Sequence, residues 1–134
     1  MRYFFILFLT VSLGAIELTP SPTKASVYFI SPNNEESLNG KVTVKFGLIN
    51  FGVAPAGIQI QNTGHHHLII DAELPPFNMP IPADKNHVHF GKGQTEVELE
   101  LSKGEHTLQL LLGDYRHIPH DPPIFSKRIK IFID

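Results

Sequence analysis

The sequence predicts an all-β fold, an antiparallel β-sandwich of about seven strands that is immunoglobulin-like in size and strand spacing. Three observations support this prediction. Several short segments alternate apolar and polar residues, and eleven prolines and ten glycines interrupt the chain at strand-length intervals. No segment of ten or more residues after the N-terminal apolar run has helical periodicity. A length of 134 residues suits one domain with its own core. The cysteine and tryptophan pattern of true immunoglobulin domains is absent.

Three strands are expected in the first half of the domain. SVYFIS, residues 26–31, predicts a strand that ends before Pro32, and the next eight residues read as a turn-rich link. KVTVKFGLI, residues 41–49, alternates throughout, which is typical of a half-buried strand. GHHHLIID, residues 64–71, follows a glycine- and proline-containing break and predicts the next strand.

The second half of the chain predicts three more long strands. QTEVELEL, residues 94–101, has three glutamates on one face and apolar residues on the other. HTLQLLL, residues 106–112, follows after a short turn, so we expect these two segments to form a hairpin. FSKRIKIFID, residues 125–134, alternates again and predicts the last strand.

The N-terminus resembles a secretory signal peptide. Arg2 precedes an apolar run from Tyr3 to Ile16, which is short for a membrane span but suits the apolar region of such a peptide. We expect a signal peptide and short spacer at 1–25 and a single domain at 26–134, in the periplasm or secreted, with no membrane insertion after cleavage. An uncleaved N-terminal anchor is the alternative.

Charge and cysteine content exclude several classes of function. Eleven Lys and Arg against thirteen Asp and Glu leave a formal net charge of −2, so no basic surface is available for nucleic acid. The absence of cysteine excludes disulfides and thiolate ligands, so nitrogen and oxygen would have to hold any metal ion. The nucleophile motif G-x-S-x-G and the phosphate-binding glycine motifs are also missing.

All eight histidines lie between residues 65 and 120. Residues two apart in a strand face the same side, so His65 and His67 share one face while His66 shares the other with Leu68 and Ile70. His87 and His89 form a second pair of this kind. Two imidazoles at this spacing can hold one ion at about 2.0–2.1 Å from each nitrogen.

The loop GDYRHIPHDPP, residues 113–123, adds two histidines within a proline-rich framework. A nitrogen-rich ligand set suits copper or zinc more than calcium or magnesium. The predicted ligands are drawn from six histidines: His65, His67, His87, His89, His117 and His120. Weaker candidates, as ligands or as hydrogen-bond partners of ligands, are Asp71, His106, Asp114 and Asp121.

A proline-rich segment, residues 72–86, separates the two histidine pairs. We expect this segment to be an ordinary connection between the two sheets. The alternative is a loop that folds over the site with Phe77 and Met79 as its apolar contacts, since loops of this length are often functional.

Several of these motifs together resemble a known family. They are GVAPAG at 52–57, TGHHHLIID at 63–71, HFGKGQTE at 89–96, and HTLQLLLGD with HIPHDPP at 106–114 and 117–123. This combination is similar to domain-of-unknown-function family 4399, a family of small exported bacterial proteins. The resemblance implies export and a compact domain in which these motifs are signature elements, and it implies no particular activity.

The leading hypothesis is an exported domain that binds copper or zinc and acts as a carrier, buffer or accessory protein. An immunoglobulin-like module that binds another envelope protein, with the histidines in a structural network, is the alternative. A small metal-dependent enzyme is the third hypothesis, and we do not expect it to be the correct one.

Overall fold

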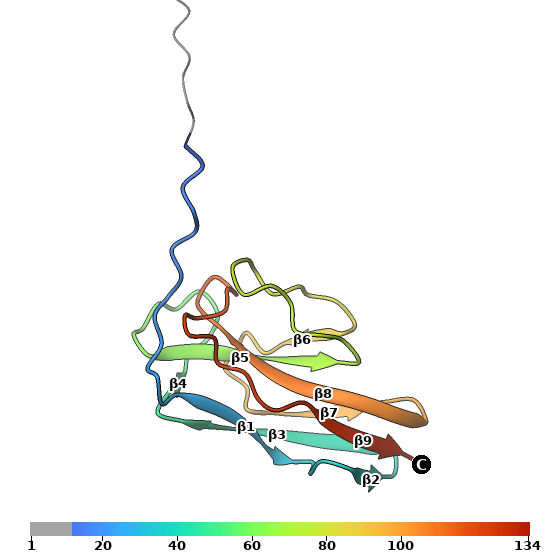
Figure 1. Cartoon of the computed structure of the whole chain (residues 1–134). Helices are drawn as coiled ribbons and strands as arrows, with labels where there is room; N and C mark the ends of the chain where they lie inside the picture. The colour runs from blue at the N-terminus through green and yellow to red at the C-terminus, as the bar shows by residue number, and fades with distance from the viewer. Residues whose placement is uncertain (1–11) are drawn as a thin grey trace, which may run out of the picture.

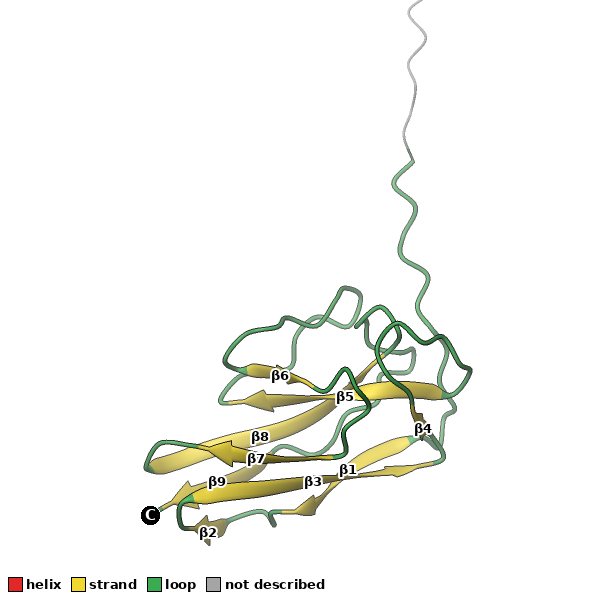
Figure 2. Cartoon of the chain, turned by 180° about the vertical axis from the view of Figure 1, so that it is seen from behind, coloured by secondary structure: helices red, strands yellow, loops and turns green. Residues whose placement is uncertain are grey.

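The computed structural model describes residues 12–134, in which nine strands and no helix occur. The strands form two sheets packed face to face, as Figures 1 and 2 show from opposite sides. The predicted all-β sandwich is therefore confirmed, with two more strands than expected. Within the described range, no helix is long and apolar enough to cross a membrane.

The smaller sheet contains β1 (Ser26–Ser31), β3 (Lys41–Ile49) and β7 (Glu96–Glu100), in the order β1-β3-β7. All its pairs are antiparallel. Lys41 and Lys45 lie opposite Glu100 and Glu96, and Lys41 Nζ is 3.1 Å from Glu98 Oε1. A row of lysines on β3 thus balances the row of glutamates on β7, because opposite charges across a strand pair attract.

In the larger sheet, ordered β2-β9-β8-β5-β4, the strand β5 (Thr63–Ile70) is paired along both edges. One edge of β5 pairs with β8 (Gly104–Gly113), and β8 pairs in turn with β9 (Ile129–Ile133). The other edge pairs with β4 (Gly52–Val53) near its start and with β6 (His87–His89) near its end. A short strand, β2 (Glu36–Leu38), lies in the expected turn-rich link and pairs with β9 in parallel.

The predicted hairpin between residues 94–101 and 106–112 is wrong. β7 pairs with β3, whereas β8 pairs with β5 and β9, so the three residues between β7 and β8 cross from one sheet to the other. The last six residues of β8 are buried on both faces, as a central strand requires, while β7 exposes its glutamates and suits a sheet edge.

The main core lies between the two sheets. Val42, Val44 and Phe46 from β3 are buried there together with leucines and isoleucines of β5, β8 and β9. His66 also faces this core, and its ring centroid is 4.9 Å from that of Phe46. The prediction that His66 shares one face of the strand with Leu68 and Ile70 is confirmed.

A second, smaller apolar cluster covers the outer face of the larger sheet. Ile69 of β5 and Leu111 of β8 pack there against Ile81 of the proline-rich segment. This segment and the loop after β8 run over that face, at the top of Figure 1. Side chains on the outer face of β5, including His65 and His67, are therefore buried although they lie outside the main core.

Residues of the expected spacer pack onto the domain. The amide of Ser21 donates to the carbonyl of Asp121 at 3.0 Å, and the amide of Asp121 donates to the carbonyl of Thr19 at 3.0 Å. The expected signal peptide begins in residues 1–11, which lie outside the described range.

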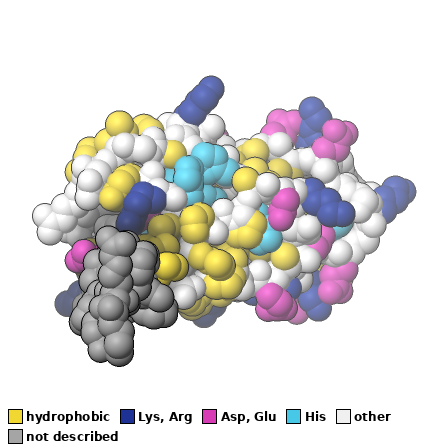
Figure 3. Space-filling model, turned by 90° about the horizontal axis from the view of Figure 1, so that it is seen from above, with side chains coloured by type: hydrophobic (Ala, Val, Ile, Leu, Met, Phe, Trp, Pro, Cys, Tyr) yellow, Lys and Arg dark blue, Asp and Glu magenta, His cyan; other side chains and the backbone are white. Residues whose placement is uncertain are grey.

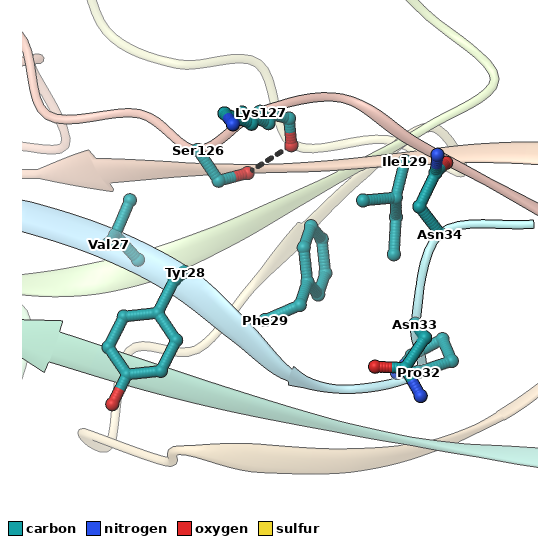
Figure 4. Close-up of a pocket in the computed structure, with 9 residues that line it drawn as sticks. All are labelled: Val27, Tyr28, Phe29, Pro32, Asn33, Asn34, Ser126, Lys127 and Ile129. Atoms are coloured by element: carbon teal, nitrogen blue, oxygen red, sulfur yellow. Dashed lines mark hydrogen bonds between the residues drawn. The ribbon is translucent and has the colours of Figure 1, made fainter.

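A pocket of about 390 Å³ lies between β1 and the segment before β9. Figure 4 shows Val27, Phe29 and Ile129 around it, with a hydrogen bond of 2.8 Å from Ser126 Oγ to the carbonyl of Lys127. No histidine lines this pocket. It is an opening at the side of the sandwich and is separate from the histidine motifs.

Replacement of Leu110 by alanine should lower the free energy of unfolding by about 2–5 kcal/mol, because this side chain is fully buried between the sheets. Ile58→Ala is the control, since Ile58 is 48% exposed, and should cost less than about 1 kcal/mol. Urea unfolding followed by circular dichroism measures both. Equal losses in the two variants would contradict this description of the core.

Candidate metal centre

The pairing of β5 with β6 brings three histidines together. His67 lies directly opposite His89 in this antiparallel pair, so both side chains face the outer side of the sheet, as does that of His65. The ring centroids are 4.7 Å apart for His65 and His67, 5.1 Å for His67 and His89, and 4.9 Å for His65 and His89. The strand register therefore places three imidazoles in mutual contact.

His117 joins this group from the turn after β8. Its ring centroid lies 5.0 Å from that of His65 and 4.7 Å from that of His89. His117 has a left-handed backbone, with φ of 67°, and its amide donates to the carbonyl of Asp114. Its own carbonyl accepts from the amide of Ile81 in the proline-rich segment. The turn and the segment above it therefore fix this fourth imidazole.

The spacing of the four imidazoles suits a single metal ion. One ring nitrogen from each of His65, His67, His89 and His117 lies within 4.8 Å of the others. Two nitrogens bound to one tetrahedral ion lie roughly 3.3 Å apart, and His65 Nε2 is 3.1 Å from His117 Nδ1. This pair already has the separation that coordination requires. Seen from the loop side, histidine side chains reach the surface among apolar neighbours (Figure 3).

Burial keeps the imidazoles of His65, His67 and His89 neutral. Burial, together with repulsion between neighbouring histidines, lowers the pKa of His65 to about 4 and that of His67 to about 2. The pKa of His89 is also lowered, by burial and by His117. Buried Nδ1 atoms of His65 and His67 have no hydrogen-bond partner among the described residues. Neutral rings bind a cation without first releasing protons.

Asp114 anchors the turn that carries His117. Its buried carboxylate accepts hydrogen bonds from Thr19 Oγ1 at 2.7 Å, from the amide of Ile118 at 3.0 Å and from the Arg116 guanidinium at 2.9 Å. Burial opposes its ionisation, but these bonds outweigh burial and hold the pKa of Asp114 below its ordinary value. Asp114 thus acts on His117 through the backbone. Thr19 and Arg116 were not among the sequence-based candidates.

The segment Gly52 to Gly57 connects the parts of the chain that carry the four histidines. Three of its amides donate to three different elements: Ala54 to the carbonyl of Gly64 at 2.9 Å, Ala56 to that of Gly91 at 2.9 Å, and Gly57 to that of Tyr115 at 3.0 Å. Gly64 precedes His65, Gly91 follows β6, and Tyr115 lies in the turn of His117. The GVAPAG stretch is therefore a backbone clamp around the site.

Two glycines leave room for the imidazoles. A β-carbon at Gly113 would lie 2.8 Å from Cε1 of His67, and one at Gly91 would overlap the ring of His89. Neither position accepts a side chain without displacing a histidine. The close approach of backbone and ring at these points brings the four histidines into one compact group.

Two of the six predicted histidine ligands lie outside this group. His87 faces the same side of β6 as His89, but its Nδ1 is 2.7 Å from Asp84 Oδ1. His120 is buried, its Nε2 is 3.2 Å from the carbonyl of Thr63, and its ring packs edge-on against Phe51. A ring nitrogen of each therefore contacts another protein group, and neither side chain belongs to the four clustered imidazoles.

Asp71 and His106 form a separate pair at the other end of β5. His106 Nδ1 is 2.7 Å from Asp71 Oδ2, and the amide of Thr107 donates to Asp71 Oδ1 at 2.9 Å. Asp71 has φ of 54°, which ends the alternation of the strand, so it orients His106 and not His65 or His67. Asp121 is exposed, and its backbone pairs with the N-terminal segment.

The proline-rich segment covers the site, but with side chains other than Phe77 and Met79. Pro80, Ile81, Pro82 and Ala83 line a pocket of about 220 Å³ together with His67, His89 and His117. Phe77 stacks on Phe125 at 5.6 Å between ring centroids, and Met79 is 48% exposed. The expected connection between the two sheets is therefore wrong, because the segment joins β5 and β6 of the same sheet, and the alternative is right about the cover but not about Phe77 and Met79.

The metal-free protein should lose stability as the pH falls from about 6.5 toward 4. In this range the unfolded chain binds more protons than the folded chain, because the folded-state pKa is about 4 for His65 and His66 and about 2 for His67, against 6.5 ordinarily. Each such histidine contributes up to about 1.4 kcal/mol per pH unit.

The raised pKa of His106 acts in the opposite direction. Burial opposes its protonation, but its hydrogen bonds to Asp71 and to the carbonyl of Ser102, together with the charge of Asp71, outweigh burial. The contribution of His106 is therefore complete below about pH 6.5 and is lost as the pH rises. The raised pKa of His106 makes the folded state more stable at low pH, whereas the three lowered pKa values of His65, His66 and His67 make it less stable, so we expect a net loss. Urea unfolding in the presence of a chelator, at about pH 7.5 and about pH 5, measures the balance. Unchanged or greater stability at the lower pH would contradict it.

Gly57→Ala should weaken metal binding by roughly tenfold, because it strains the clamp that holds the turn of His117. Gly57 has φ of 82° and no atom within 4 Å of the added β-carbon. Gly40→Ala is a matched control, with φ of 69° and equally open surroundings away from the site. Affinity for zinc is measured by competition with a chelating dye. An equal loss of affinity in both variants would contradict a specific role of the clamp.

Comparison with known proteins finds the family that the sequence motifs resemble. The family model described as "Domain of unknown function (DUF4399)" matches residues 44–134, a range that contains all eight histidines. No curated protein and no solved structure matches the chain, so the immunoglobulin-like assignment stays a prediction. The match covers more than half of the sequence, and the chain belongs to the DUF4399 family.

Proposed function

We propose that this protein is an exported domain that binds copper or zinc through His65, His67, His89 and His117, and that it acts as a metal carrier, buffer or accessory protein. The observation that carries the proposal is the convergence of four imidazoles from β5, β6 and the turn after β8. Their ring nitrogens come from three separate parts of the chain.

The chemistry of the ligand set supports copper or zinc. Imidazole nitrogen is a good ligand for both ions, whereas calcium and magnesium prefer oxygen. The nearby carboxylates are already engaged, Asp114 with Arg116 and Thr19 and Asp84 with His87. The group therefore offers nitrogen alone, held in place by the clamp and by the Asp114 turn.

Partial access to the site supports reversible exchange of the ion. His65 and His67 are buried, but His89 is exposed and His117 is half-buried. A carrier or buffer must release its ion as well as bind it, so some ligands must be reachable by solvent or by a second protein. This gradient of exposure is suited to such exchange.

Export is part of the proposal and is supported by the apolar run that follows Arg2. We place signal cleavage near Gly14 and Ala15, because Thr19 binds Asp114 and would be lost by cleavage near Ala25. The domain would then function in the periplasm or outside the cell.

His89→Ala should weaken binding of copper and zinc by about 10- to 100-fold, because it removes one of four ligands. His87→Ala is the matched control on the same strand and should change affinity by less than about threefold. Calorimetric titration of metal-depleted protein with each ion measures both variants. The unmodified protein should bind one ion per chain.

Absence of saturable binding in the unmodified protein would refute the proposal. It would favour the structural alternative, which the hydrogen bond between His65 and His117 supports. In that case the His89→Ala variant would lose thermal stability whether or not metal is present.

A further inference from the structure

One side of the histidine group opens into a pocket. Three of the four imidazoles, those of His67, His89 and His117, line this pocket of about 220 Å³. His65 is fully buried and is not part of the lining. An ion held by all four rings would therefore have His65 behind it and the pocket on its other side.

The pocket lacks a group that could neutralise the ion. The remaining lining residues, Pro80 to Ala83, are uncharged. The group of possible metal ligands consists of four histidines and contains no carboxylate. Asp114 is held by Arg116, with Oδ2 2.9 Å from Nη2. A divalent ion bound only by neutral imidazoles keeps its full charge, and attraction for an anion increases in apolar surroundings.

The size of the pocket limits its ligand. Water occupies about 30 Å³ in the liquid, so about 220 Å³ holds a ligand of a few heavy atoms with some water. Apolar walls formed by two prolines, Ile81 and Ala83 offer no hydrogen-bonding side chain that would select a large polar molecule. The bound metal ion would therefore be the main source of attraction for a ligand in this pocket.

We propose that the metal ion bound by His65, His67, His89 and His117 keeps an open coordination position toward this pocket, and that a small monodentate anion binds there. This inference rests on the proposed metal site. The anion donates one lone pair to the ion, and no bond within the anion is broken. Four imidazoles complete a tetrahedral set, so the anion would be a fifth ligand, which the tetragonal geometry of copper(II) accommodates.

Azide is the probe that tests the open position. Titration of the copper(II)-loaded full chain with azide should produce a saturable charge-transfer band and shift the electron paramagnetic resonance spectrum. Ala83→Phe should fill the pocket and weaken azide binding by about tenfold, with copper affinity within about threefold of the unmodified protein. Met79→Phe is the control, because Met79 lies in the same segment but does not line the pocket.

The outcomes separate this inference from the proposed function. Failure to bind copper would refute the metal site itself. Copper binding without a change in either spectrum on addition of azide would overturn the open position alone. If Ala83→Phe and Met79→Phe have the same effect on azide binding, the anion does not occupy this pocket and the inference is wrong. Ala83→Leu serves as a second, smaller pocket-filling variant with the same criteria.

Discussion

The register between β5 and β6 is the constraint on which the site depends. His67 stands opposite His89, and a shift of one residue would turn His89 toward the main core. Pairing of β5 with β8 along its other edge, from His65 to Ile70, stabilises this register. Because β5 is paired along both edges, the same hydrogen bonds that hold the larger sheet together also determine which imidazoles meet.

The site is stabilised by groups that do not themselves face an ion. Burial of imidazoles with unpartnered nitrogens costs free energy, and the apolar clusters on both faces of the larger sheet offset that cost. The Gly52 to Gly57 clamp and the Asp114 turn restrict where His65, His89 and His117 can lie. Such restriction favours binding, because the side chains lose little further conformational freedom when a ligand binds.

Local pattern predicted most of the fold. Alternation alone located the strand at 41–49 with its observed bounds and placed His66 on the same face as Leu68 and Ile70. It failed at the connection between β7 and β8, because a short link between two amphipathic strands suits either a hairpin or a crossing between sheets. Complementary charges on β3 and the burial of β8 on both faces decided between them, and both depend on residues far away in the sequence.

The sequence by itself determined the kind of ligands that a metal site could use: no thiolates, and leading histidine candidates paired by strand parity as His65 with His67 and as His87 with His89. Tertiary structure decided which members converge. His89 joins the group while His87 bonds to Asp84, and His117 joins it while His120 packs on Phe51. The physical reason is that parity assigns a face to a side chain, whereas a shared position depends on strand register and on the left-handed backbone of His117.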